Sequence, residues 1–232
     1  MHIKLEVEYL GTGFFGFQIQ PNKRTVQGEL EKTLSKYFRT EIKVVAAGRT
    51  DGGVHAFGQT VSFLYVNDKI PDKDWLYKFT NSINSFLPDD MSVKNAEIKD
   101  KFNARQEAKS KTYVYKCYVS PHRSATRDPF YLQLYKMPNI EIMRSEAKKF
   151  EGSHDFSKFT TEIENKNPRR TIYNFDIEVR GDEILFIIKG RSFLKRMVRM
   201  LVGHLLNIAL SKSSNCPNTA PAKGLVLQLV EY

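Results

Sequence analysis

Residues 47–56, which read Ala-Gly-Arg-Thr-Asp-Gly-Gly-Val-His-Ala, concentrate residue types that can carry chemistry. The three glycines of this segment allow the backbone to turn sharply and to approach a ligand closely. Arg49 stands two residues before Asp51, so its guanidinium can pair with the carboxylate and keep it ionised. Such a carboxylate can act as a nucleophile or a general base. On spacing alone, an ordinary glycine-rich turn with a surface ion pair explains the segment better, because polar turns of this kind are common.

Other catalytic chemistries find little support among the remaining residues. His55 could act as a general base, but its place after Val54 at the entrance to a strand favours a hydrogen-bonded structural histidine. Five histidines and two cysteines without a close ligand spacing argue against a metal site. Gly11, Gly13 and Gly16 lack the spacing of a dinucleotide-binding loop. A carboxylate on the loop at residues 47–56 therefore remains the strongest chemical candidate.

Lysines and tyrosines alternate along residues 109–116, where a strand is expected. Tyr113 and Tyr115 share one face of this strand, and Lys109, Lys111 and Lys116 flank them. An aromatic ring on a basic strand can stack on a nucleobase while lysines bind phosphates. The alternative is that both rings line the core, and for Tyr115 the sequence does not separate the two interpretations.

A second basic cluster contains no acidic residue and leads into an amphipathic helix that is expected to start near Phe193. A helix N-terminus with adjacent cations is a natural phosphate site. Without an anion these cations oppose the helix dipole, which favours a bound anion over a merely solvated face. Arg169 and Arg170, after Lys166, could extend this surface. The cluster comprises Lys189, Arg191, Lys195, Arg196 and Arg199.

The composition agrees with a nucleic-acid partner. The chain has 232 residues, of which 41% are hydrophobic, and this is typical of a globular protein. Its 36 Lys and Arg against 26 Asp and Glu leave a net charge of +10, which suggests a polyanionic partner. The charged opening segment is not a signal peptide, and apolar runs such as residues 184–188 are too short to span a bilayer. We therefore expect a soluble, cytoplasmic protein without a disulfide framework.

Hydrophobic periodicity indicates the elements that must position the loop at residues 47–56. Alternation predicts a strand over residues 3–9, and apolar residues at helical spacing predict a helix over residues 26–38 with Thr25 as its N-cap. The first hundred residues then read β-α-β-β-α-β, the split order of a ferredoxin-like fold. The other elements expected in this half are strands at 42–47, 59–66 and 92–98 and a helix at 75–83 that ends before Pro88.

The second half repeats this theme loosely. We expect an α+β protein in which two ferredoxin-like, split β-α-β subdomains, residues 1–100 and 101–232, pack on a shared, mostly antiparallel sheet. The elements expected in the second half are strands at 111–120 and 130–134, a helix at 140–150, a hairpin of 171–180 with 183–189, a helix at 193–208, a polar loop at 211–223 and a closing strand at 225–232.

Residues 47–56 closely resemble the signature of the tRNA pseudouridine synthase A (TruA) family, which usually has Ala in place of Gly52. The resemblance continues in order along most of the chain, and it implies the pseudouridine synthase fold. The further matching segments are residues 8–20, 26–27, 102–105, 111–113, 152–156, 193–203 and 222–225.

This resemblance implies an isomerase that converts uridine to pseudouridine at positions 38–40 of the tRNA anticodon arm, without a metal or an organic cofactor. Asp51 would be the nucleophile, and Arg49 would pair with it and help to displace the target base. Tyr113 would stack on the flipped uracil and could help to remove the C5 proton, since a stem base must leave the stack before it can react. Whether Asp51 attacks the uracil ring or the ribose stays open.

The resemblance also implies a homodimer that holds one tRNA across both subunits. Residues 1–100 would carry the catalytic loop and residues 101–232 would complete the RNA-binding cleft. Residues 14–24 would form a mobile, partly basic clamp, and Arg199 would lie near Asp51. The substrate-binding residues implied in this way are Tyr113, Arg199, Arg105, Arg24, Lys23 and Arg191.

Several positions depart from the family pattern. Gly52 should loosen the turn after the nucleophile. Leu10 stands where the family has Asp, Phe17 stands where it has Trp, and the segment between Leu210 and Ala222 is shorter. Two alternatives therefore accompany the main hypothesis. One is a non-catalytic RNA-binding or tRNA-folding protein on the same fold, and the other is a relative that modifies other RNA sites.

Overall fold

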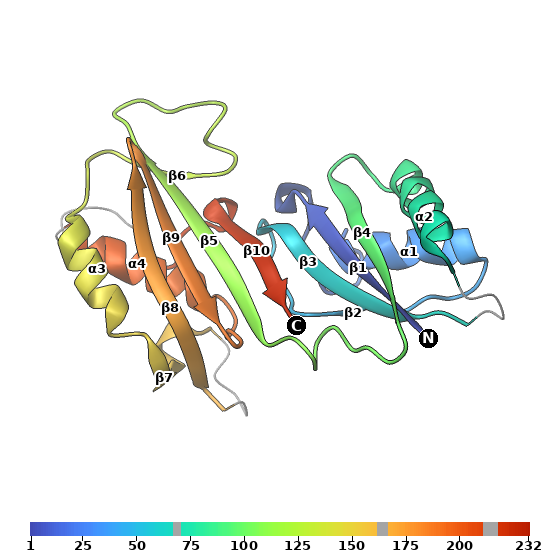
Figure 1. Ribbon diagram of the computed structural model, residues 1–232. Helices are drawn as coiled ribbons and strands as arrows, with labels where there is room; N and C mark the ends of the chain where they lie inside the picture. The colour runs from blue at the N-terminus through green and yellow to red at the C-terminus, as the bar shows by residue number, and fades with distance from the viewer. Residues whose placement is uncertain (67–70, 162–166, 211–217) are drawn as a thin grey trace. The chain divides into compact units, whose positions relative to one another are not determined.

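The computed structural model describes residues 1–66, 71–161, 167–210 and 218–232. The chain divides into two compact units (Figure 1): unit 1 consists of Met1–Lys109 and Leu227–Tyr232, and unit 2 of Ser110–Val226. The expected boundary near residue 100 and the assignment of the closing strand to the second half differ from this division. Lys109 N–H donates to the Glu231 carbonyl at 2.8 Å, and the Tyr232 hydroxyl donates to the Ala104 carbonyl at 3.0 Å. These long-range bonds, which have no local sequence signal, place the chain's end in unit 1.

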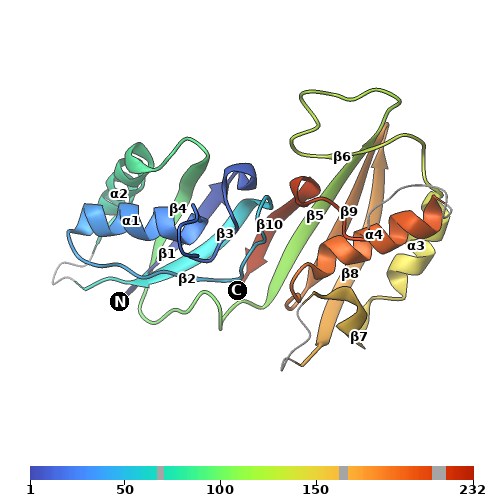
Figure 2. The ribbon, with the colours of Figure 1, turned by 180° about the vertical axis from the view of Figure 1, so that it is seen from behind.

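Unit 1 contains a sheet with the strand order β4-β1-β3-β10. Strand β1 pairs antiparallel with β3 and with β4, and the short β2 pairs antiparallel with β3. Two helices lie on one face of this sheet (Figure 2). The predicted β-α-β-β-α-β order is confirmed. The elements are β1 (His2–Tyr9), α1 (Val26–Phe38), β2 (Val45–Ala46), β3 (His55–Leu64), α2 (Lys73–Phe86), β4 (Met91–Lys99) and β10 (Leu225–Glu231), of which residues from Leu227 onward belong to unit 1.

The core of unit 1 follows the predicted periodicities. Ile3, Leu5 and Val7 of β1 are fully buried and alternate with half-exposed charged residues. They face the apolar stripes of the helices, and the Thr25 side chain caps α1 by accepting a hydrogen bond from Gly28 N–H at 3.3 Å. The strand, the helix and its N-cap are therefore confirmed.

The predicted strand at residues 42–47 is wrong in extent, because only Val45–Ala46 pairs with β3. Side chains of α1 take the backbone bonds that a longer strand would need. The Ile42 N–H donates to Ser35 Oγ at 2.9 Å, and the Val44 N–H donates to Glu31 Oε1 at 3.0 Å. Because β3 begins at His55 rather than at residue 59, the loop before it is also shorter than predicted.

Unit 2 has the strand order β5-β9-β8-β7, with antiparallel pairs, and β6 joins β5 in parallel. Its two helices pack against each other on one face of the sheet (Figure 2). The α+β class with mostly antiparallel pairing is thereby confirmed. The elements are β5 (Ser110–Val119), β6 (Leu132–Leu134), α3 (Ile140–Lys148), β7 (Gly152–Asp155), β8 (Arg169–Arg180), β9 (Glu183–Gly190) and α4 (Met197–Ala209).

Two features of unit 2 differ from the prediction. Helix α4 begins at Met197 rather than near Phe193, because Arg196 adopts a left-handed conformation with φ 61°. Strand β7 was missed because all four of its residues are exposed, which leaves no apolar alternation to detect. Part of the predicted loop at 211–223, together with Lys166 and Cys216, lies outside the described residues. Within the described ranges, no helix is long and apolar enough to cross a membrane.

Candidate active site

Asp51 lies in unit 1 on the loop between β2 and β3. The Val54 N–H donates to the Asp51 carbonyl at 3.2 Å and closes a turn over residues 51–54. Gly53 has φ 80°, a left-handed conformation in which glycine avoids the strain that a Cβ would bring. At the start of the loop, the Ala47 N–H donates to the Thr60 carbonyl at 2.8 Å. The loop is thus short and closed at both ends, and it presents Asp51 as a partly exposed side chain.

The segment that follows β1 packs directly against this loop. The Phe17 N–H donates to the Thr50 carbonyl at 3.0 Å, and the Gly53 N–H donates to the Phe14 carbonyl at 3.3 Å. These two bonds fix the residues on either side of Asp51 and Gly52. The orientation of Asp51 therefore depends on a segment that lies more than thirty positions earlier in the chain.

His55 has a structural role, as its sequence context predicted. Its side chain is 1% exposed, and its Nδ1 accepts a hydrogen bond from the Gly11 N–H at 3.1 Å. A Cβ on Gly11 would lie 2.1 Å from the Val54 carbonyl oxygen, so this close backbone approach requires glycine. Gly11 and His55 together hold the end of the Asp51 loop against the segment after β1.

Arg49 lies on the same loop, two residues before Asp51. Its exposed guanidinium donates through Nη1 to Gln18 Oε1. Gln18 is brought there because the neighbouring Phe17 is bonded to Thr50. This tertiary contact holds the Arg49 guanidinium at the surface, and its pairing with Asp51 stays a prediction.

Two buried polar side chains that the sequence analysis did not single out lie behind the loop. The Tyr9 hydroxyl lies 2.7 Å from Thr50 Oγ1, and Gln59 Nε2 donates to the Gly48 carbonyl at 2.9 Å. Burial raises the pKa of Tyr9 to about 12, so its hydroxyl remains protonated at neutral pH. The available signal was a polar group at a position where the strand pattern expects an apolar one.

Residues 14–24 form a loop whose two cations behave differently. The Lys23 side chain is exposed and stacks over the Phe15 ring at 4.4 Å. Arg24 instead donates to both carboxylate oxygens of Asp90, each at 2.7 Å, and lies over the Phe14 ring at 4.2 Å. The structure therefore makes Arg24 an anchor of the loop, and its contact with substrate stays a prediction. The Lys23 side chain is left exposed at the surface of the loop.

Arg105 lies on a short loop of unit 1 that is held by backbone contacts. The Arg105 N–H donates to Asn103 Oδ1 at 3.0 Å, and the adjacent Ala104 N–H donates to Ser62 Oγ at 3.1 Å. The Arg105 side chain is exposed. This arrangement offers a guanidinium at the surface from a fixed backbone, as a phosphate contact would need.

In unit 2, the two tyrosines of β5 have separate environments. Tyr115 is fully buried, and its hydroxyl donates to the Pro221 carbonyl at 2.9 Å, so the core interpretation of this residue is correct. Tyr113 is 7% exposed, and its ring meets Phe193 edge-on with centroids 5.2 Å apart. Tyr113 thus belongs to an aromatic pair next to the basic segment that precedes α4.

That basic segment is only partly helical. Arg191, Lys195 and Arg196 are exposed and precede α4, whereas Arg199 lies in its first turn. Arg199 is partly buried, and its Nε donates to the Ala220 carbonyl at 2.7 Å. The first turn of α4 contains no acidic residue, and no side chain caps it at Arg196. An anion at this end would find both the helix dipole and the cations favourable.

The family model described as "tRNA pseudouridine synthase" matches residues 6–106 and 147–216, which include the Asp51 loop and α4. The chain belongs to the tRNA pseudouridine synthase family. A tRNA pseudouridine synthase A from Thermosipho melanesiensis is 40% identical and covers 98% of both chains. The proteins of the same name from Thermotoga neapolitana and Ruminiclostridium cellulolyticum are 39% and 38% identical, with coverage of 97% and 99% of each chain. The predicted family is confirmed, and with it an isomerase on the pseudouridine synthase fold.

Gly52, which stands where the synthase signature usually has Ala, affects the turn less than the sequence suggested. Unlike Gly53, it is not in a left-handed conformation, so an alanine can adopt its backbone angles. A Cβ on Gly52 would lie 3.3 Å from the Phe15 carbonyl carbon, so an alanine here requires the Phe15 backbone to move by a few tenths of an ångström. The turn owes its shape to Gly53, which this synthase shares with the family signature.

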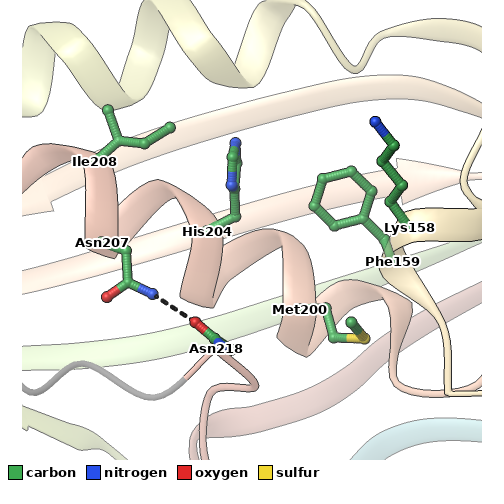
Figure 3. A pocket seen from close by; sticks show the side chains of 7 residues that line it. All are labelled: Lys158, Phe159, Met200, His204, Asn207, Ile208 and Asn218. Atoms are coloured by element: carbon green, nitrogen blue, oxygen red, sulfur yellow. Dashed lines mark hydrogen bonds between the residues drawn. The ribbon is translucent and has the colours of Figure 1, made fainter. Parts of the chain in front are cut away.

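A cavity of about 670 Å³ lies elsewhere in unit 2, along one side of α4 (Figure 3). His204 and Met200 of α4 face it together with Phe159, and the Asn207 amide bonds to Asn218 at its rim. Within residues 1–66, 71–161, 167–210 and 218–232, no acidic side chain lines it. Among the described residues of the synthase, no group of three or more His, Cys, Asp or Glu is placed to hold a metal ion. The described residues that line the cavity are Lys158, Phe159, Met200, His204, Asn207, Ile208 and Asn218.

Proposed function

We propose that this chain converts uridine to pseudouridine at positions 38–40 of the anticodon arm of tRNA, with Asp51 as the nucleophile. The observation that carries the proposal is the Asp51 loop: a partly exposed carboxylate stands on a closed turn whose neighbours on both sides are hydrogen-bonded to the segment after β1. The relatives named tRNA pseudouridine synthase A support the choice of substrate.

The proposed reaction rearranges one bond and needs no oxidant or reductant. The Asp51 carboxylate adds to the target nucleotide, at the ribose or at the uracil ring, and the bond from N1 of uracil to C1′ of ribose breaks. The uracil turns, C5 bonds to C1′, and the proton on C5 leaves while N1 gains one. Asp51 is then released unchanged. The product is an isomer of the substrate, so every atom is accounted for.

Two other residues are proposed to act on the same nucleotide. A base in an RNA stem must leave the base stack before Asp51 can reach it, and the gap that it leaves in the stem must be filled or stabilised. Tyr113 is proposed to stack on the flipped uracil and to help remove the C5 proton, and its pairing with Phe193 keeps its ring in a fixed orientation. Arg49, exposed on the same loop as Asp51, is proposed to pair with Asp51 and to help displace the target base.

The binding of tRNA is proposed to rest on exposed cations. Arg191, Lys23 and Arg105 are exposed side chains on backbones that hydrogen bonds fix. The net charge of +10 supports long-range attraction of a polyanion. Arg199 is proposed to contribute as well, although it also bonds to Ala220. We further propose a homodimer that acts in the cytoplasm, both on the strength of the family resemblance.

Tritium release from anticodon stem-loops labelled at uridine C5 tests this function. Purified protein without added metal should release tritium and leave pseudouridine at positions 38–40. Asp51→Asn should abolish release while its affinity for the same RNA stays within about twofold, because the change removes charge and nucleophilicity but little volume. Asp89→Asn is the matched control, since Asp89 is an exposed carboxylate of the same unit.

Each outcome decides between named alternatives. Turnover by Asp51→Asn would exclude Asp51 as the nucleophile. No release by the unaltered protein, together with tight and salt-dependent RNA binding, would support a non-catalytic tRNA-binding protein on this fold. Release only from uridines outside the anticodon arm would retain the synthase and replace the proposed target. Sedimentation of the protein alone tests the dimer.

A further inference from the structure

Three side chains beneath the Asp51 loop are polar although they are buried in the core of unit 1. Gln59 is 0%, Tyr9 3% and Thr50 7% exposed. Tyr9 ends β1, Gln59 lies on β3, and these strands pair directly. Burying a polar group without need is unfavourable, so three together at one place require an explanation.

Thr50, the residue before Asp51, is held at two points. Its Oγ1 lies 2.7 Å from the Tyr9 hydroxyl, and its carbonyl accepts from Phe17 N–H at 3.0 Å. Gln59 Nε2 donates to the same Tyr9 hydroxyl at 3.5 Å, and either hydroxyl of the Tyr9–Thr50 pair can donate the proton of their shared bond. The peptide that leads into Asp51 therefore cannot rotate without breaking a buried hydrogen bond.

Gln59 holds the loop at Gly48, two residues before Thr50. Its Nε2 donates to the Gly48 carbonyl at 2.9 Å. Within the described part of the chain, Gln59 Oε1 is buried and accepts no hydrogen bond. An unsatisfied buried acceptor is unfavourable, because it has lost its hydrogen bonds to water and gained none within the protein. An apolar residue would fill this position without that penalty, so folding alone does not explain a glutamine here.

We propose that Tyr9 and Gln59 are positioning residues, which fix Thr50 and Gly48 and thereby hold the Asp51 carboxylate in its reactive orientation. This inference rests on the proposed function, because it concerns the same nucleophile. Its physical basis is that the rate of attack depends steeply on alignment, and a displacement of about 1 Å can slow a reaction by about a hundredfold. Both side chains are buried, so we expect neither to contact the nucleotide or to change its binding.

The test is a comparison of kcat, RNA affinity and thermal stability in variants that remove single hydrogen bonds. Tyr9→Phe and Thr50→Val each delete one partner of the buried pair and keep the shape of the side chain. Each should lower the single-turnover rate at saturating enzyme by about tenfold while Kd for the stem-loop stays within twofold. The double variant should be no slower than either single variant, because both remove the same bond. Thr50→Ser retains the hydroxyl and should restore most of the rate.

Tyr118→Phe is the matched control in unit 2. Tyr118 is also fully buried, but its hydroxyl accepts a hydrogen bond from the Ser124 N–H of a surface loop, at 3.0 Å. The Tyr118→Phe variant should at most lose thermal stability, and its single-turnover rate should equal that of the unaltered protein. Gln59→Met, of similar length, should slow the reaction as Tyr9→Phe does.

The possible outcomes distinguish a failure of the positioning role from a failure of the proposed function. If the unaltered protein releases no tritium, the proposed function fails. If it is active and Tyr9→Phe and Thr50→Val keep rates within twofold of it, the function stands and the positioning role is overturned. A slower Thr50→Val that Thr50→Ser does not correct would likewise overturn it, since the effect would then come from packing. Melting temperatures within a few degrees show that the compared variants are folded.

Discussion

The Arg24 guanidinium binds Asp90 through two parallel hydrogen bonds of 2.7 Å each, across 66 positions of sequence. Arg24 ends the loop at residues 14–24, and Asp90 precedes β4 directly. The pair therefore ties the segment that supports the Asp51 loop to the edge strand of the unit 1 sheet. The same Arg24 also contacts Glu29 at 3.2 Å, so it links the loop to α1 as well.

Asp90→Asn should destabilise the protein by about 1 kcal/mol at pH 7, since the pair is bidentate but partly screened by solvent. Arg24 lowers the pKa of Asp90 below its ordinary value of 3.8. Because the folded-state pKa is depressed, the pair's contribution is fully present above the unfolded pKa and is lost as pH falls through the folded pKa. Urea unfolding from pH 7 down to pH 3 should show the difference from the unaltered protein narrowing only at the acidic end. A difference that is the same at every pH would contradict this account; Asp89→Asn is the control.

Gly52→Ala should retain activity and leave stability unchanged or raise it by up to about 1 kcal/mol. Its backbone conformation suits alanine, and alanine reduces the freedom of the unfolded chain. Gly53→Ala should instead lose about 1–2 kcal/mol, because φ 80° brings Cβ into conflict with the backbone. Thermal unfolding of both variants checks the contrast. Equal losses would show that the two glycines do not differ as described.

Gly11→Ala should impair the Asp51 loop from its far end. A Cβ there would lie 2.1 Å from the Val54 carbonyl oxygen, which is backbone and cannot move aside without shifting the turn. We expect a loss of about 2 kcal/mol or more in stability, together with a lower rate in the tritium assay. Unchanged stability and rate would mean that the segment after β1 can separate from the loop without consequence.

Arg191→Ala should weaken RNA binding and lower the slope of log K against log salt by about 0.7–0.9 if Arg191 contacts one phosphate. Its side chain is exposed, so the melting temperature should stay the same. Lys136→Ala removes an exposed cation from the same unit but outside the cluster, and serves as the control. Arg199→Ala should lower both affinity and stability, because Arg199 also bonds to the Ala220 carbonyl. Identical slopes for Arg191→Ala and Lys136→Ala would remove Arg191 from the binding surface.

The elements that follow from local pattern were predictable. Alternating apolar residues predict strand β1, and an apolar stripe with the Thr25 cap predicts helix α1. Gly181 predicts the turn of the β8–β9 hairpin, where it has φ 63°. The short β2 and the start of α4 were not predictable, because they depend on the partners that Glu31 and Thr160 find elsewhere in the fold. The Thr160 hydroxyl, for example, donates to the Lys195 carbonyl at 3.1 Å just before α4 begins.

The family, the order of elements in unit 1 and the residues of the Asp51 loop could be predicted from the sequence, because they depend on residue identity and on neighbours within a few positions. Long-range contacts, which carry no local sequence signal, anchor the loop through Arg24, join Arg49 to Gln18 and place Tyr9 under Thr50. A side chain's partner depends on which strand or loop the fold brings beside it. Tyr9 and Thr50 are 41 positions apart, and only the pairing of β1 with β3 brings their hydroxyl groups together.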